Sequence, residues 1–515
     1  MKNSNLAILI LSSALALSCA GASKSGSTSV PEDVPFGMPE VSAPSIPSRS
    51  VSVADFGGVG DGVTLNTESF AKAFEELERQ GGGRVVVPAG IWFTGPIGLK
   101  SHTELHLDAN AIIVFSTDQN LYPIVETNFE GLDMKRCLAQ VHAENATDIA
   151  ITGKGVIDGN GAPWRELKKR KVGDDIWKGV VKSGGVLSAD GKVWYPDEGY
   201  MKARLTAGSL NMQDPSLDLQ EIKTFLRPVL VNLRECERVL LEGVTFQNSP
   251  SWNVHPLWCK DLTIRNITVR APHYSTNGDG IDIDGCENVI LTGSSFDVGD
   301  DAICIKSGKD EDGRRHAMPC RNLYISDCTV YHGHGGFVIG SEMSGGVENI
   351  LVENCRFIGT DVGLRFKSTR GRGGEVRDIW CRNIYMKDIV AEAVTFNLYY
   401  AGVSSTEKAT VSDGNVPKSG TSPAKTAQNE GAVPENGTSP ALPAVDETTP
   451  VFHGFRFDNL VCSGAKQAIY INGLPELPLR DLSFSNSVFQ AKKGVEVNNA
   501  EGVTFSNVTV NGKKI

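Results

Sequence analysis

Hydrophobic and polar residues alternate along most of the chain in short runs that polar turns separate. From residue 237 onward one phrase recurs: a polar residue, an alternating apolar run, a turn containing Asn, Asp or Gly, and a second short apolar run. The copies begin at Glu237, Lys260, Glu287, Arg321, Glu348 and Arg382, with later copies at His453, Arg480 and Glu501 and an early one at Thr147. Units of two or three short strands that recur every 23 to 34 residues between 237 and 382 are typical of a solenoid.

A single unit of this kind cannot bury a face alone, whereas stacked units bury a continuous interior of Val, Ile and Leu. A β-sandwich also contains many short strands, but it gives no reason for the copies to align residue for residue. We therefore predict an all-β fold, a right-handed parallel β-helix that forms one domain over residues 51–515.

The start of such a solenoid needs a cap, because its first coil would otherwise expose open strand edges. Residues 66–80 have the pattern of one amphipathic helix, with Phe70, Phe74 and Leu77 on one face and Gly81 after its end. Asn66 stands at the N-cap position. We expect this helix to cover the first coil.

Two segments interrupt the repeat. Residues 161–226 contain three of the seven Trp residues and form an insertion of mixed composition. Residues 402–450 contain no aromatic residue and consist mostly of Ser, Thr, Pro, Ala, Gly and Glu. Such a composition cannot bury enough apolar surface to offset the entropy of ordering, so we predict a disordered loop there.

The first residues have the features of an export signal. Lys2 precedes an apolar run that is too short to span a bilayer, and small residues follow. Residues 15–19 also resemble a bacterial lipobox, with Cys19 as the lipidated residue. We predict a signal over 1–19 and a flexible tether over 20–50, hence a periplasmic or outer-membrane lipoprotein; plain secretion is the alternative.

The net charge and the cysteine content exclude some classes of protein and of binding site. The net charge of −11 argues against a nucleic-acid binder, and a lipid at Cys19 would be the only link to a membrane. The ten other cysteines include no Cys-x-x-Cys pair, which argues against a structural zinc site. Several of them recur at one place in the repeat and are best explained as small core residues that stack coil on coil. We expect a monomer.

Polar residues replace apolar ones in four short elements of the repeat. These elements are Asn277–Gly280, Gly299–Asp301, Gly333–Gly335 and Arg365–Lys367. Each alone is usually a solvated turn or an exposed strand edge. Asp279 lies 21 residues before Asp300, while His334 and Arg365 follow at steps of 34 and 31, about one coil each. In a solenoid this spacing brings all four elements to one face.

Three clustered carboxylates cannot all ionise easily, so at least one pKa is raised. Glycoside hydrolysis needs such an arrangement, with one protonated and one ionised carboxyl group. Arg365 and Lys367 are two residues apart and project the same way from a strand, as suits the binding of a sugar carboxylate. Asp300 and Asp301 are adjacent, so both reach one cleft only if the chain turns there, which Gly299 permits.

These four elements resemble the signatures of the polygalacturonase-like glycoside hydrolases, family 28, over roughly residues 50–400. Gly278 and Phe366 depart from the usual Thr and Ile. The segment Ser249–Pro256, with His255, also looks like the family's sequence just upstream of the site. The resemblance implies an inverting hydrolase of galacturonosyl linkages on a right-handed parallel β-helix, with a pectic polysaccharide as its partner and no metal or organic cofactor.

By position, the resemblance also implies the roles of individual residues. Asp300 corresponds to the general acid, Asp279 and Asp301 to the pair that activates water, and His334 to the catalytic histidine. Arg365 and Lys367 correspond to the residues that hold the substrate carboxylate, and we add Asn277 and His255 as substrate-binding candidates.

Several alternatives remain open at this stage. Rhamnogalacturonan or substituted pectin could be the natural substrate. A pectate lyase on the same fold, or a non-catalytic carbohydrate-binding β-helix, would be different classes of protein. We favour exo action, because the 161–226 insertion precedes the site and could close one end of a groove. Residues 365–377 carry five basic side chains and one acidic one, Glu375, so the overall acidity of the chain does not exclude an anionic polymer as substrate.

Overall fold

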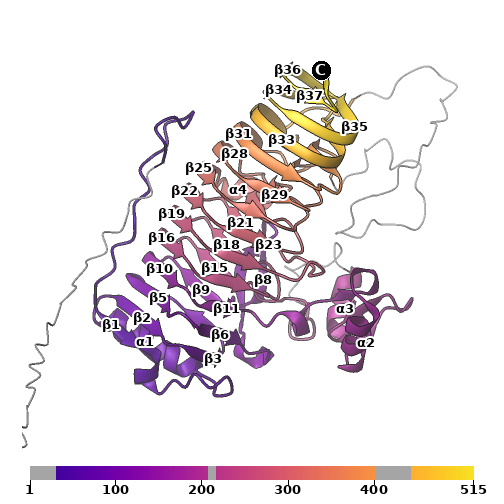
Figure 1. The fold of residues 1–515 in the computed structure, drawn as a ribbon. Coiled ribbons are helices and arrows are strands. Elements are labelled where there is room, and N and C mark those ends of the chain that lie inside the picture. The colour runs from indigo at the N-terminus through magenta and orange to yellow at the C-terminus, as the bar shows by residue number, and fades with distance from the viewer. Residues whose placement is uncertain (1–29, 207–215, 401–441) are drawn as a thin grey trace, which may run out of the picture.

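A computed structural model of the chain describes residues 30–206, 216–400 and 442–515. These residues form the predicted right-handed parallel β-helix, which Figure 1 shows as a stack of coils rising from the N-terminal to the C-terminal end. Within the described ranges, 33 strands belong to one hydrogen-bonded set. Each coil contributes to three parallel sheets, which we number in chain order beginning with the sheet that holds β15 (Val231–Arg234).

The first sheet carries the candidate site. Its strands are β4 (Ile97–Gly98), β9 (Val141–Glu144), β15 (Val231–Arg234), β18 (Val254–Leu257), β21 (Ile281–Asp284), β24 (Ile303–Lys306), β27 (Phe337–Ile339), β30 (Leu364–Lys367) and β32 (Glu392–Asn397).

The second sheet is the longest of the three. Its strands are β1 (Ser50–Ser52), β2 (Gly83–Val87), β5 (Thr103–Leu107), β10 (Thr147–Gly153), β16 (Glu237–Glu242), β19 (Lys260–Arg265), β22 (Glu287–Thr292), β25 (Cys320–Ser326), β28 (Val347–Glu353), β31 (Glu375–Lys387), β33 (Val451–Asn472), β34 (Leu479–Ser485) and β36 (Ala500–Ser506). Two of these strands, β31 and β33, continue around a corner and also pair outside this sheet.

The third sheet closes each coil. Its strands are β3 (Gly90–Thr94), β6 (Ala111–Phe115), β11 (Val156–Asp158), β17 (Thr245–Gln247), β20 (Thr268–Arg270), β23 (Ser295–Asp297), β26 (Thr329–Val330), β29 (Arg356–Ile358), β35 (Val488–Asn498) and β37 (Thr509–Val510). At the C-terminal end, β37 pairs antiparallel with β38 (Lys513–Lys514).

The interior is a column of aliphatic, aromatic and cysteine side chains. Phenylalanines stack from coil to coil, as in Phe366–Phe396 and Phe457–Phe484, whose ring centroids lie 4.5 and 4.6 Å apart. All ten cysteines of the described ranges are buried free thiols, and eight of them belong to the main core, as predicted for several. This packing fixes where each coil lies relative to the next.

Asparagine and aspartate side chains stack at one corner of the coils. The Asn322 amide donates to Asn288, which donates in turn to Asp261, at 3.1 and 2.8 Å. Asn288 and Asn322 have φ near 57° and 59°, a left-handed conformation that Asn tolerates better than most residues. The ladder keeps the same turn in successive coils.

The predicted capping helix is α1 (Thr67–Arg79), which buries Phe70, Phe74 and Leu77 against the first coils. Asn66 does occupy the N-cap position, but its side chain makes no capping hydrogen bond. It is 1% exposed, and its amide bonds the backbone carbonyls of Val59, Thr64 and Phe93 instead. Asn66 therefore fixes the preceding loop rather than the helix end.

The N-terminal stretch differs from the predicted flexible tether in its second half. Apolar residues of this stretch, among them Val34, Phe36 and Met38, pack on the outer face of the second sheet against a cluster that includes Trp380. The ribbon from residue 30 runs down the side of the stack to β1 (Figure 1). Residues 30–49 are thus a strap, because they cover apolar side chains that would otherwise face water. The predicted signal at 1–19, with Cys19, lies outside the described residues.

Two elements project from the coils. A hairpin of β7 (Ile124–Phe129) and β8 (Leu132–Cys137) forms its own antiparallel sheet, which the sequence pattern did not reveal. The segment between β11 and β15 holds a small sheet and two helices. These elements are β12 (Leu167–Lys168), β13 (Val186–Leu187), β14 (Val193–Tyr195), α2 (Asp174–Lys182) and α3 (Glu198–Thr206). The remaining helices are α4 (Asp310–His316) and short 3-10 turns at Val53–Phe56, Gln119–Leu121, Ala162–Trp164 and Lys169–Lys171.

The loop predicted over 402–450 lies outside the described residues as far as residue 441. In its last part, the Thr448 carbonyl accepts hydrogen bonds from the backbone of Gly371 and Gly373. Among the helices of the described ranges, none is long and apolar enough to cross a lipid bilayer.

Candidate active site

The four elements singled out in the sequence meet at the first sheet. Asp279 lies in the turn before β21, Asp300 and Asp301 lie in the turn before β24, and His334 lies in the turn before β27. Arg365 and Lys367 project from β30. Because β21, β24, β27 and β30 are neighbours in that order, these six residues come from successive coils.

One carboxylate oxygen from each of Asp279, Asp300 and Asp301 lies within 4.8 Å of the other two. Asp279 and Asp301 are almost completely buried, whereas the side chain of Asp300 is 25% exposed. The two adjacent aspartates both reach the trio because they stand in a bend and not in a strand. The bend is fixed by the Asp301 N–H, which donates to the Asp300 carboxylate at 3.1 Å.

Three cationic side chains contact this trio of carboxylates. The Lys367 ammonium donates to Asp301 at 2.6 Å, and the Arg365 guanidinium donates to the same carboxylate at 3.1 Å. The His334 Nδ1 atom lies 3.0 Å from an oxygen of Asp300. The carboxylates are close enough to share a divalent cation, yet protein cations already neutralise two of them.

These contacts separate the pKa values of the three aspartates. Burial raises the pKa of Asp279 well above its usual range, and the carboxylates of Asp282 and Asp300 raise it further. Burial opposes ionisation of Asp301 as well, but Lys367 and Arg365 hold the pKa of Asp301 below its usual range. Asp301 is therefore the ionised carboxylate and Asp279 the one that burial keeps protonated.

Asp300 and His334 form a coupled pair. Burial would raise the pKa of Asp300, but the charge of His334, with Lys367 and Arg365, holds it well below its usual range. The Asp300 carboxylate in turn raises the pKa of His334 above its ordinary 6.5. Without substrate, the one proton that this pair shares resides on the histidine.

A buried charged network under the trio was missed by the sequence reasoning. Lys306 donates to Glu342 at 2.9 Å and lies 3.7 Å from Asp282. Both carboxylate oxygens of Asp282 lack a hydrogen-bond partner within the described ranges. The available signal was charge inside apolar strands, since Asp282 and Lys306 interrupt runs of Ile.

Tyr400 is a second residue that the sequence reasoning missed. Its ring lies 4.7 Å from the Lys367 ammonium and 5.5 Å from the Arg365 guanidinium. Cation–π contacts of this kind help to hold the two cations in place. A pair of Tyr residues just before the polar loop was the only trace of it in the sequence.

Among the described residues, neither of the other two candidates forms a hydrogen bond or ion pair with a carboxylate of the trio. His255 is 1% exposed, and its Nε2 atom lies 3.5 Å from Asp284 beneath the β7–β8 hairpin. Asn277 lies two residues before Asp279 in the chain, and its amide is held by Arg227 at 3.0 Å and by Glu130 at 3.3 Å. Both residues support the surroundings of the trio.

The chain is similar in sequence to known glycoside hydrolases. The family model for glycosyl hydrolases family 28 matches residues 172–418. A probable polygalacturonase of Vitis vinifera is 34% identical over 68% of this chain and 63% of its own length. An exo-poly-alpha-D-galacturonosidase of Dickeya chrysanthemi is 29% identical over 70% of this chain and 58% of its own length.

Among solved structures, a hyperthermoactive exopolygalacturonase from Thermotoga maritima matches with a TM-score of 0.72 and 32% identity. The match covers 92% of this chain and 94% of that one. The chain belongs to the glycosyl hydrolases family 28. It spans about three fifths of the length of the two curated relatives.

Proposed function

We propose that the protein is a glycoside hydrolase that cleaves α-1,4-galacturonosyl linkages in pectin or polygalacturonate, with inversion and from a chain end. The observation that carries this proposal is the trio of aspartates, with one carboxylate ionised by Lys367 and Arg365 and another sharing a proton with His334. The names of the relatives in Vitis, Dickeya and Thermotoga support the substrate class.

Asp300 is the general acid in this proposal, because it is the most exposed carboxylate of the trio and therefore the one that reaches a leaving oxygen. Its proton comes from the pair with His334. A galacturonate carboxylate that binds Arg365 and Lys367 would neutralise two of the charges that lower the pKa of Asp300. Substrate binding thus favours transfer of the shared proton to Asp300.

Asp301 is the base that accepts a proton from the attacking water, since Lys367 and Arg365 keep it ionised. Asp279 faces the same water from the neighbouring coil and positions it. Arg365 and Lys367 serve both the base and the substrate carboxylate. A planar guanidinium beside an ammonium suits this double contact.

The pH dependence follows from the same pairs. His334 has a raised pKa, so the proton that it shares with Asp300 is present at low pH and is lost as the pH rises above 6.5. On the acid side, protonation of Asp301, whose pKa lies below its usual range, removes the base. We expect kcat/KM on polygalacturonate to be bell-shaped, with its basic limb above pH 6.5. A profile that stayed flat from mildly acidic to mildly alkaline pH would contradict the shared proton.

Product analysis tests the proposed reaction. Polygalacturonate should yield reducing ends without ultraviolet-absorbing unsaturated products, and a chelator should not change the rate. NMR of the new anomeric centre should show inversion. The carboxylate oxygens of the trio lie closer together than the roughly 6.5–9.5 Å usual between the two carboxyl groups of inverting enzymes. Retention of the anomeric configuration would therefore contradict the proposed inversion. Faster cleavage of rhamnogalacturonan would contradict the substrate assignment.

We also propose that the protein is exported and acts as a monomer, with a lipid on Cys19. The lipobox-like sequence supports the anchor, and the size of a pectic polymer supports a place outside the cytoplasm. Labelling with a radioactive fatty acid should mark the protein, and Cys19→Ala should lose the label.

A further inference from the structure

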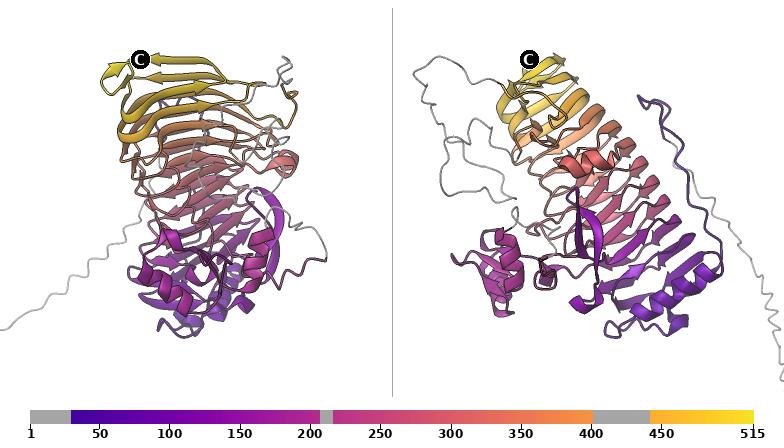
Figure 2. Two further views of the ribbon diagram at one scale, coloured as in Figure 1. Left: turned by 90° about the vertical axis from the view of Figure 1, so that its right-hand side faces the viewer. Right: turned by 180° about the vertical axis from the view of Figure 1, so that it is seen from behind.

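The β7–β8 hairpin lies along the first sheet on the N-terminal side of the trio. The right-hand view of Figure 2 shows it standing along the stack with its tip beside α4. Its residues line a pocket together with His142, Asn232 and His255. Those three side chains occupy equivalent positions on β9, β15 and β18, so they form a row.

This row would be the floor of an open groove if the hairpin were absent. In the next coil, the register places Asp282 opposite His255, so the row leads directly to the trio. The hairpin covers the row because the ring of Phe129 packs on that of Trp252, with centroids 4.3 Å apart. Arg136 stacks on Phe129 and donates to the Arg227 carbonyl at 2.7 Å, which fixes the hairpin from its base.

The tip of the hairpin reaches both edges of the first sheet. At one edge, Glu130 accepts a hydrogen bond from Asn277 at 3.3 Å. At the other edge, the Gly131 carbonyl accepts from the backbone of Lys309 at 2.9 Å. Asp133 contacts Arg315 and His316 of α4 at 2.7 and 2.9 Å. The tip is therefore latched across β21.

The second projecting segment meets the same turn. Thr276 donates to Glu166 at 3.4 Å, and Arg227, near the end of the segment, donates to the Thr276 carbonyl at 3.0 Å. Its three tryptophans are buried: Trp177 and Trp194 share a small cluster, and Trp164 belongs to a second cluster with Tyr122 and Cys137 at the base of the hairpin. The segment thus braces the turn, while the hairpin covers the floor.

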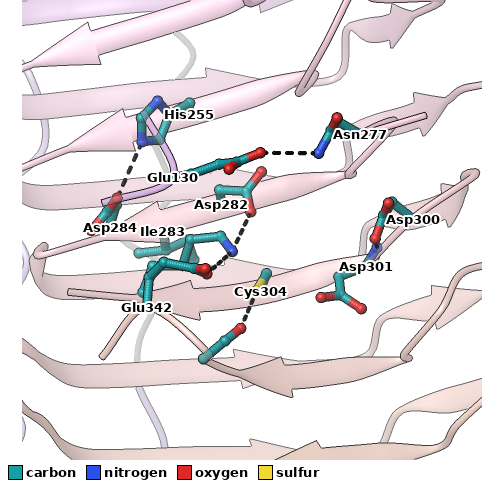
Figure 3. Close-up of polar contacts among 12 residues, drawn as sticks. Glu130, His255, Asn277, Asp282, Ile283, Asp284, Asp300, Asp301, Cys304 and Glu342 are labelled. Atoms are coloured by element: carbon teal, nitrogen blue, oxygen red, sulfur yellow. Dashed lines mark hydrogen bonds and ion pairs between the residues drawn. The ribbon is translucent and has the colours of Figure 1, made fainter. Parts of the chain in front are cut away.

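We propose that the tip of the β7–β8 hairpin is the wall that ends the cleft, and that Glu130 binds the terminal sugar of the substrate. This inference rests on the proposed function and names the element behind its exo action. Figure 3 shows Glu130 over β21, beside Asp282 and next to Asn277. A carboxylate there accepts hydrogen bonds from the free hydroxyl groups of a terminal sugar. It repels the carboxylate that a further galacturonate would bring.

Two variants and one control test the wall. In the first variant, Asn-Gly replaces residues 126–135, which keeps the Val125–Arg136 pair and closes it with a favoured two-residue turn. The second variant is Glu130→Ala. The control is Lys135→Ala, on the same hairpin, whose side chain is 49% exposed. Circular dichroism and thermal unfolding establish that each variant folds.

The wild type and the control should release only the terminal sugar or disaccharide early from polygalacturonate. The shortened hairpin should release oligomers of intermediate length early, with a faster fall in viscosity per bond cleaved. Glu130→Ala should raise KM for a pentagalacturonate about tenfold with little change in kcat, as expected when a charged hydrogen-bond acceptor is lost.

The outcomes separate this inference from the proposed function. If the shortened variant folds and still releases only terminal products, the proposal that the hairpin tip ends the cleft is wrong. If that variant does not fold, an unchanged KM in a folded Glu130→Ala enzyme overturns the role of Glu130. A wild type that forms no new reducing ends on any galacturonate polymer would instead contradict the proposed function.

Discussion

Replacing Asp300 by Asn should nearly abolish hydrolysis of polygalacturonate and leave the β-helix folded. The variant keeps the shape of the side chain but cannot donate the proton that Asp300 shares with His334 at 3.0 Å. Loss of general acid catalysis costs a factor of about 10²–10⁴ in kcat. Reducing-end assays give kcat, and circular dichroism with thermal unfolding shows whether the fold is kept.

The chain offers a matched control for this variant. Asp297, at the end of β23, and His332 form a similar pair at 2.7 Å outside the trio, with both side chains about half exposed. Asp297→Asn should therefore retain nearly full activity. Equal losses in the two variants would mean that the effect arises from the local fold. Nearly full activity in Asp300→Asn would rule out Asp300 as the acid.

Replacing Lys367 by Met should have the second-largest effect. The variant removes the ammonium that donates to Asp301 at 2.6 Å and leaves a buried carboxylate with a weaker partner. Removing one member of a buried ion pair lowers the free energy of unfolding by about 3–5 kcal/mol. Because Lys367 is the main cation that lowers the pKa of Asp301, that pKa should rise. The acid limb of the kcat/KM profile should move to higher pH.

A second readout separates substrate binding from the effect on Asp301. If Lys367 also holds the galacturonate carboxylate, the wild type should prefer free polygalacturonate over its methyl ester, and Lys367→Met should lose much of that preference. Lys387→Met is the control, since Lys387 is exposed and pairs only with its neighbour Asp388 in the part of the chain described. A variant with the wild-type acid limb and preference would contradict both roles of Lys367.

The regular spacing of the repeat explains why the β-helix and most of the candidate site could be predicted from the sequence. In a solenoid, residues one repeat apart become neighbours, so the distances of Asp279, Asp300, His334 and Arg365 along the chain translate directly into one face. The same logic predicted several of the cysteines that stack in the core. The capping helix was predictable because its apolar face has a clear period.

Contacts between segments far apart in the chain were not predictable in this way. Glu130 meets Asn277 from 147 residues away, and no repeat relates the two. The pairing of Lys367 with Asp301 depends on side-chain reach across coils, which the pattern does not encode. The apolar residues of 30–49 looked like a tether because their partners on the second sheet, between Ile290 and Trp380, are far away in the sequence.

The strap has a consequence for how the molecule unfolds. Coils of a solenoid contact mainly their neighbours, so such a stack can fray from either end. The strap bonds Asp148 through Ser45 and Arg382 through Asp33, and it thereby joins an early coil to a late one. Unfolding at either end of the stack must therefore first break the contacts that the strap makes with the other end. Cooperativity that the repeat itself does not provide is thus supplied by a segment outside it.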